Sequence, residues 1–152
     1  MPVSSHIVVR ILVALAVFGA LSSLVGAVLA VAANGAGVPV EHLANSPFSS
    51  YVVPGLILGV VVGGTQLAAA IALLARHRTA LVLSAVAGFG MLIWIFAELA
   101  IIRQYSWLQT VYFSLGALEL IIVLALLGII PALVVPLQGS DRPLPSNALT
   151  HV

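Results

Sequence analysis

Four long apolar runs dominate the hydropathy pattern of this chain, and short polar segments separate them. Each run reaches the roughly 20 residues that an α-helix needs to cross the hydrocarbon core of a bilayer. A helix pairs its backbone groups internally, whereas an isolated strand in lipid would leave them unpaired. The pattern therefore predicts an all-α membrane protein, a four-transmembrane-helix bundle. The transmembrane domain is expected over residues 1–137, with helices at about 7–33, 54–75, 80–102 and 109–135.

Turn-forming residues mark the connections between these helices. Residues 34–37, Asn-Gly-Ala-Gly, should end the first helix, and residues 76–79, Arg-His-Arg-Thr, predict a tight polar hairpin. Before the second helix, Ser46 is a candidate helix cap and Pro47 suits a first helical position. We expect a short interfacial helix in this connection, which is either an outward-facing lid or a linker anchored at the membrane surface.

The fourth helix has start and stop signals of its own. Ser106 or Thr110 can cap its beginning, and Pro131 and Pro136 should bend or stop it. Residues 138–152 contain further prolines and no apolar period, which predicts a flexible cytoplasmic tail.

The first apolar run has a second interpretation, a cleaved secretion signal. Arg10 precedes the run, and residues 30–32, Ala-Val-Ala, resemble a cleavage site. However, the apolar region of a signal is about 7–15 residues long, and this run continues from Ile11 to Ala33. We therefore predict a retained first helix.

Composition agrees with a lipid environment, because 62% of the residues are apolar and only 6% are charged. A typical soluble protein is about 45–50% apolar and about 25% charged. A net charge of +1 without basic runs argues against a nucleic-acid partner, and the absence of cysteine excludes disulfides and thiolate metal sites. All basic side chains are arginines, which is typical of a GC-rich bacterial genome.

The arginines also predict the orientation. With four crossings, Arg10, Arg76, Arg78 and Arg142 share one side of the membrane and Arg103 lies on the other. The positive-inside rule then places this four-arginine side, with both termini, in the cytoplasm. The opposite side collects six aromatic residues, as in an interfacial belt: Phe48, Tyr51, Tyr105, Trp107, Tyr112 and Phe113.

A glycine repeat is the clearest packing signal in the chain. Gly55, Gly59 and Gly63 follow one another at four-residue spacing in the second helix, a glycine-zipper pattern that lets helix backbones approach closely. The repeat is either a contact inside the bundle or the seam of a homo-oligomer. We favour the internal contact, because a four-helix bundle already needs such faces.

Glu119 is the most unusual polar residue, since counting from Gln109 places it roughly 15 Å deep in the membrane. Tyr112 lies seven residues earlier, on the same helix face, which should point into the bundle. An ionised carboxylate at this depth costs at least ~2.5–3.5 kcal/mol. Glu119 is therefore either a functional site or a structural residue that hydrogen-bonds Gln66, Thr65 or a backbone carbonyl.

Glu98 lies about one turn from the end of the third helix, where it can reach the interface or pair with Arg103. Its helix stripe should face the other helices. Members of that stripe are Ser84, Gly88, Met91, Ile95 and Glu98. Together, Glu98, Glu119 and Gln66 would form a polar staircase for protons or a small solute if their faces coincide.

Two stretches carry a family resemblance. Residues 46–56 read Ser-Pro-Phe-Ser-Ser-Tyr-Val-Val-Pro-Gly-Leu, and residues 94–116 carry Trp94-Ile95-x-x-Glu98 and, later, Ser106-Trp107-Leu108-Gln109. In these stretches the chain resembles small four-span integral membrane proteins of bacteria, especially actinobacteria. The resemblance implies the architecture and an inner-membrane location, and it implies no activity.

The chemistry of the remaining residues gives no sign of a metal or cofactor. All four histidines lie outside the spans or at their edges, so none can ligate a haem in the bundle core.

The leading hypothesis is a non-enzymatic accessory or structural membrane component, with a membrane-protein partner or a second copy of the chain. The alternative is a small permease or proton-coupled carrier that uses Glu119. An enzyme acting on a lipid or quinone has least support, because no nucleophile or redox group is recognisable.

Overall fold

The computed structural model of the protein describes residues 5–44, 46–103 and 105–129. Four helices in this part of the chain are long and apolar enough to cross a membrane. They are α1 (Ser5–Ala32), a composite helix over Val52–Leu74, α4 (Ala80–Ile102) and α5 (Trp107–Leu126). The predicted all-α fold with four spans is confirmed. The predicted tail at 138–152 lies outside the described residues.

The second span is not a continuous α-helix. It begins as α2 (Val52–Ile57), passes through the π-helical segment η2 (Leu58–Gly63) and ends as α3 (Gly64–Leu74). In a π-helix the backbone hydrogen bonds reach five residues back, so each turn is wider than in an α-helix. Gly59 and Gly63 lie inside η2, and their missing side chains leave the backbone freer to adopt this geometry.

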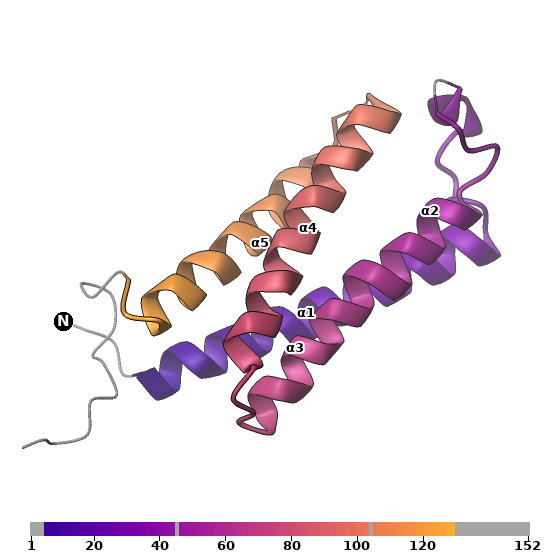
Figure 1. The fold of residues 1–152 in the computed structure, drawn as a ribbon. Coiled ribbons are helices and arrows are strands. Elements are labelled where there is room, and N and C mark those ends of the chain that lie inside the picture. The colour runs from indigo at the N-terminus through magenta and orange to yellow at the C-terminus, as the bar shows by residue number, and fades with distance from the viewer. Residues whose placement is uncertain (1–4, 45, 104, 130–152) are drawn as a thin grey trace, which may run out of the picture.

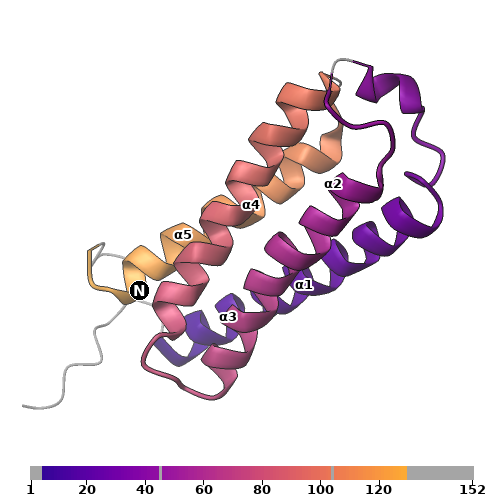
Figure 2. The ribbon, with the colours of Figure 1, turned by 45° about the vertical axis from the view of Figure 1, so that its right-hand side comes forward.

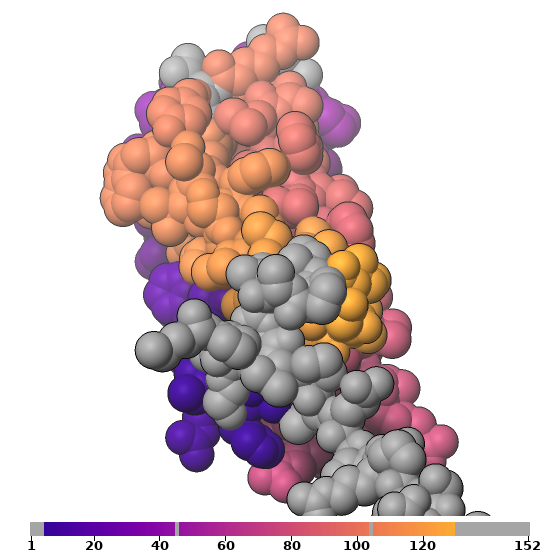
Figure 3. Space-filling model, turned by 90° about the vertical axis from the view of Figure 1, so that its left-hand side faces the viewer, coloured from indigo at the N-terminus to yellow at the C-terminus, as the bar shows by residue number. Residues whose placement is uncertain are grey.

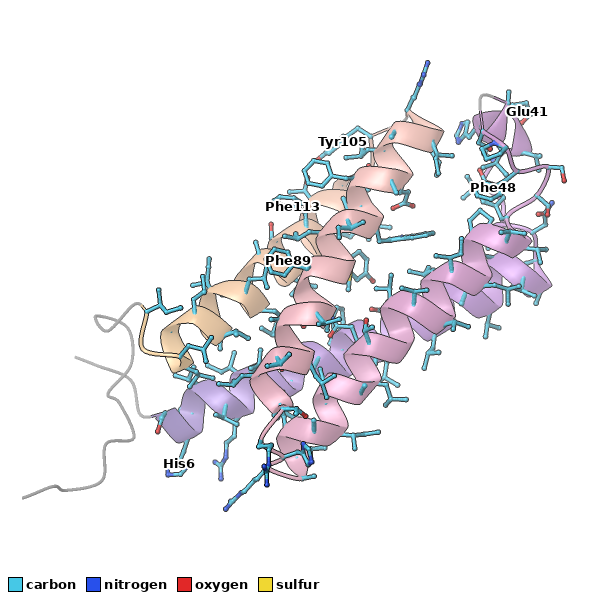
Figure 4. The ribbon with its side chains drawn as sticks, in the orientation of Figure 1. His6, Glu41, Phe48, Phe89, Tyr105 and Phe113 are labelled. Atoms are coloured by element: carbon cyan, nitrogen blue, oxygen red, sulfur yellow. The ribbon has the colours of Figure 1, made fainter. Side chains whose placement is uncertain are left out.

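The helices form two antiparallel pairs, as Figures 1 and 2 show. In the first pair, α1 packs along α2, η2 and α3; in the second, α4 packs along α5. The pairs are joined mainly where α3 packs against α4, with a further contact between α1 and α5. From the side, α5 lies between α1 and α4 (Figure 3). Figure 4 shows His6 at one end of the bundle, with Glu41 and Phe48 at the other.

The connections follow the sequence signals in three places. Asn34, Gly35, Ala36 and Gly37 all have positive φ angles, so the chain leaves α1 in a left-handed conformation. The Arg-His-Arg-Thr hairpin joins α3 to α4 over residues 75–79. At α5, Ser106 forms the capping box with Gln109, and the helix accordingly begins at Trp107.

Two predicted details of the connections are wrong. The fourth helix ends at Leu126, not near 135, because Gly128 adopts φ +76° and the Ile129 amide closes back onto the Leu124 carbonyl. Before the second span, the short helix is η1 (Val40–Leu43), a 3₁₀ helix that ends before Ser46. The Ser46 hydroxyl instead donates to the Leu43 carbonyl and accepts from the Phe48 amide, so it stabilises a turn.

The helices pack most closely at the end that holds the Arg-His-Arg-Thr hairpin. Buried alanines from three helices meet there: Ala16, Ala69, Ala70 and Ala87. A second cluster continues toward the hairpin and includes Val8, Leu12, Leu73 and Val123. We call this part of the bundle, residues 5–20 with 64–90 and 116–126, the closed half. The rest of the four spans forms the open half.

Candidate functional site

A cleft of about 740 Å³ separates the two helix pairs in the open half. It exists because α2 packs mainly along α1, and α4 mainly along α5, so the pairs diverge beyond the closed half. Its walls come from all four spans and from the connection before α2. Representative wall residues are Gly26 and Leu29 of α1, Leu58 of η2, Trp94 and Ile95 of α4, and Leu108 of α5.

The connection between α1 and α2 covers the end of the cleft. Figure 2 shows η1 beside the end of α4, and the two elements are in contact. Tyr51 holds this loop in place: its backbone amide donates to Asn34 Oδ1 at 3.0 Å, and its hydroxyl donates to the Pro39 carbonyl at 3.0 Å. Gly35 is required beside the phenol ring, because a β-carbon there would lie 2.6 Å from Tyr51 Cδ2. Tyr51 and Leu43 are buried beneath this otherwise largely exposed loop, which we call the roof of the cleft.

The environment of the Tyr51 phenol is electrostatically negative. Burial raises its pKa above the ordinary value, and the carboxylates of Glu41 and Glu98 raise it further. The phenol therefore stays protonated and keeps donating its hydrogen bond to Pro39. Both carboxylates thus act at the roofed end of the cleft.

Glu98 lies in the wall of the cleft, half-buried, against the side chain of Gln109. The Gln109 oxygen is engaged by the Ser106 amide in the capping box, which leaves its NH₂ group for the carboxyl of Glu98. Arg103 follows the last turn of α4 with φ +54°, is exposed and does not line the cleft. Of the two options for Glu98, the pairing with Arg103 is not seen, and the carboxyl contacts Gln109 instead.

The inner end of the cleft is lined by Ser22, Ser23, Met91 and Tyr112. Tyr112 is half-buried and stacks on Phe18, with ring centroids 6.4 Å apart. Beyond these residues the closed half begins.

A buried polar pair lies just past this inner end. Gln66 Nε2 of α3 donates to Glu119 Oε2 of α5 at 2.9 Å, and the two residues are 0% and 2% exposed. The bond links the two helix pairs across the centre of the bundle. Gly19 of α1 makes room for it, because a β-carbon at Gly19 would lie 2.9 Å from Gln66 Cδ. Gln66 Oε1 is buried without a hydrogen-bond partner among the described residues.

The predicted polar staircase divides into two separate places. Glu98 and Tyr112 line the cleft, while Glu119 and Gln66 pair with each other in the closed half and do not line it. Thr65 belongs to neither, since its hydroxyl donates to the Val61 carbonyl of its own span. Glu119 thus has the Gln66 partner that the structural interpretation of this residue required.

The three glycines of the second span contact α1 inside the same chain. A β-carbon on Gly55 would lie 2.5 Å from Ala30 Cβ, and one on Gly59 would lie 2.7 Å from Ala27 Cβ. Gly63 lies at ordinary contact distance from α1. This close approach uses the glycine face of the second span for α1, so that face is not available to α4.

Two residues of the cleft wall, Trp94 and Tyr51, were not predicted from the sequence to belong to a site. Trp94 precedes Glu98 by one helical turn and follows Met91 by three residues, so the inward stripe of α4 could have identified it. Tyr51 carries no comparable signal, because its place depends on the loop that folds back over α1. The stripe itself faces inward as predicted, since Ser84, Gly88, Met91 and Ile95 are buried.

Within the described residues, no group of three or more His, Cys, Asp and Glu side chains lies close enough to hold a metal ion. A comparison of the chain with protein-family models, with curated proteins and with solved structures finds no match. The resemblance to bacterial four-span proteins therefore stays a prediction.

Proposed function

We propose that this protein is a small non-enzymatic accessory component of the membrane, and that it works by holding an apolar molecule from the bilayer in its cleft. The observation that carries this proposal is the cleft itself. Its volume of about 740 Å³ falls in the range of roughly 300–1,000 Å³ typical of small-molecule sites. Its walls are mainly apolar, with a few polar groups gathered near the roof and the inner end.

Support also comes from the rigidity of the surroundings. The roof is fixed by two hydrogen bonds of Tyr51, and the inner end abuts the closely packed closed half. A site formed before its ligand arrives loses less conformational entropy on binding. The non-enzymatic part of the proposal follows from the sequence, in which no nucleophile or redox group is recognisable.

The two tryptophans allow a direct test in lipid nanodiscs. Trp94 lines the cleft, whereas Trp107 is 67% exposed at the start of α5. In a Trp107→Phe variant, bromododecane should quench Trp94 with a saturable dependence on concentration, because the cleft is a finite site. In Trp94→Phe, quenching of Trp107 should rise without saturation, as for a residue that meets bulk lipid.

A cleft-filling variant sharpens this test. Ser22→Phe places a ring in the cleft and should remove the saturable component of Trp94 quenching. Val60→Phe adds a ring at a position that is 73% exposed and should leave saturation intact. Non-saturable quenching of Trp94 in the Val60→Phe background would contradict the proposal.

A proton-coupled carrier is the second candidate, and the buried Gln66–Glu119 pair is the observation that favours it. An acidic side chain held in the bundle interior beside an acceptor without a partner is a suitable place for a transferred proton. Glu119→Gln keeps the size of the side chain and removes its titration. A carrier would lose proton-coupled flux in proteoliposomes, whereas a purely structural pair would leave any flux unchanged.

A further inference from the structure

We propose that the preferred occupant of the cleft is an amphipathic cation, with its positive group beside Glu98 and its apolar body along α1 and α4. This inference rests on the proposed binding function and adds the chemical class of the ligand. Three independent features of the cleft wall support it: its charge, its aromatic side chains and the direction in which its polarity changes.

The charge of the wall favours a cation. Glu98 is the one carboxylate among the described residues that line the cleft, and no arginine lines it. The Tyr51 phenol next to it feels the carboxylates of both Glu41 and Glu98. His42, at the roof, is the one wall residue able to carry positive charge. A carboxylate in surroundings of low polarity is stabilised by an opposite charge that reaches it from the ligand.

Aromatic side chains line the cleft, and two of them, Trp94 and Tyr51, lie toward the end that holds Glu98. Trp94 lies one turn before Glu98 on α4, and three tyrosines also line the cleft: Tyr51 at the roof, Tyr105 just before α5 and Tyr112 at the inner end. The face of an aromatic ring attracts cations, tryptophan most strongly, and quaternary ammonium groups are commonly recognised by such rings. A carboxylate with several aromatic neighbours therefore selects for a cation more than for a neutral molecule of the same shape.

The polarity of the wall changes along its length. Near the roof lie Glu98, Gln109 and Tyr51, while the middle is formed by aliphatic residues such as Leu29, Leu58 and Ile95. A ligand with one charged end and an apolar body satisfies both regions at once. Since Glu98 is only about one turn from the end of α4, the charged group would lie near the membrane surface, where its desolvation costs less.

Tetraphenylphosphonium and its neutral analogue tetraphenylsilane test this inference, because they share a shape and differ in charge. Both are titrated against the Trp107→Phe protein in nanodiscs, with Trp94 fluorescence as the readout. We expect the cation to bind at least about tenfold more tightly than the silane, beyond the difference in partitioning into empty nanodiscs. Equal affinities would overturn the inference and leave the cleft-binding function standing. If neither molecule gives a saturable signal, the proposed function fails as well.

Two variants assign the preference to the carboxylate. Glu98→Gln should remove most of the tenfold preference and leave the affinity for tetraphenylsilane within about twofold. Glu98→Asp retains the charge and should retain the preference for the cation. A preference that survives in Glu98→Gln would overturn the role of Glu98. If Glu98→Gln does not fold, the comparison of the two ligands in the Trp107→Phe protein still decides the inference.

Discussion

The closed and open halves of this bundle contain the same four spans, yet only one of them packs without a gap. In the closed half the helices meet through alanines such as Ala16, Ala69 and Ala87, which allow backbones to approach closely. In the open half, α4 presents Trp94, Ile95 and Glu98 toward the gap. Helices in lipid associate by close packing and not by the hydrophobic effect, so bulky facing side chains keep them apart.

The glycines of the second span also show that small residues bring helices close together. Gly55 and Gly59 bring the second span close to α1, where Ala30 and Ala27 are the facing residues. The smallest residues of the second span are thereby used within the first helix pair. The glycine face is therefore not available to the second pair in the open half, and the cleft remains between the two pairs.

The largest expected effect concerns the two ends of the bundle, which should face opposite sides of the membrane. The chain contains no cysteine, so single cysteines can be introduced at exposed positions without a background signal. With both termini in the cytoplasm, an impermeant maleimide applied to intact cells should label Ser49→Cys and should not label His77→Cys until the cells are opened. The reverse pattern would invert the predicted orientation.

The next largest effect concerns the glycine contacts that hold the first pair together. Gly59→Leu forces a side chain into a space where even a β-carbon meets Ala27, and overpacking of this kind costs about 1–3 kcal/mol or more. We expect a clearly lower midpoint of thermal unfolding in detergent. Gly64→Leu is the matched control, because Gly64 has no atom within 4 Å of an added β-carbon. Equal midpoints for the two variants would refute the contact.

An intermediate effect is expected at the bond between the two pairs. Gln66→Leu leaves the buried Glu119 carboxyl without its partner, while Glu119→Gln retains a polar side chain that can still bond Gln66. A double-mutant cycle with Gln66→Leu and Glu119→Leu should give a coupling free energy of about 0.6–1.7 kcal/mol, the range of hydrogen bonds between membrane helices. A coupling of zero would show that the bond does not stabilise the closed half.

The smallest effect should be confined to the roof of the open half. Tyr51→Phe removes the hydrogen bond to Pro39 and should cost about 1 kcal/mol, seen as faster amide exchange in residues 34–51 with unchanged exchange in α3. Ionisation of the phenol has the same consequence. Since its pKa is raised in the folded protein, the roof is most stable below the ordinary value of about 10 and loses stability as the pH rises through the raised value. After correction for base-catalysed intrinsic exchange, the protection of amides in residues 34–51 should therefore fall as the pH rises in the wild type and not in Tyr51→Phe.

Local signals were sufficient to predict much of this fold. The spans follow from apolar run length, and the start of α5 follows from Ser106 and Gln109, which are three residues apart and form a capping box. The end of α5 was misjudged because the prolines beyond it were weighted above Gly128, which ends the helix first. Glu119 was rightly expected to face the interior, because its neighbours at i−3 and i−7 define one face.

Apolar run length and helical period were enough to predict that four helices form, where three of the connections lie and which stripe of α4 turns inward. The packing of the helices against one another was needed to establish that Glu119 meets Gln66, that Glu98 turns to Gln109 and that a cleft remains between the pairs. Those outcomes depend on residues far apart in the chain: Gln66 and Glu119 are 53 positions apart, and the sequence between them carries no local signal of their meeting. How closely two helices approach is fixed by both facing surfaces together, and a single run of sequence describes only one of them.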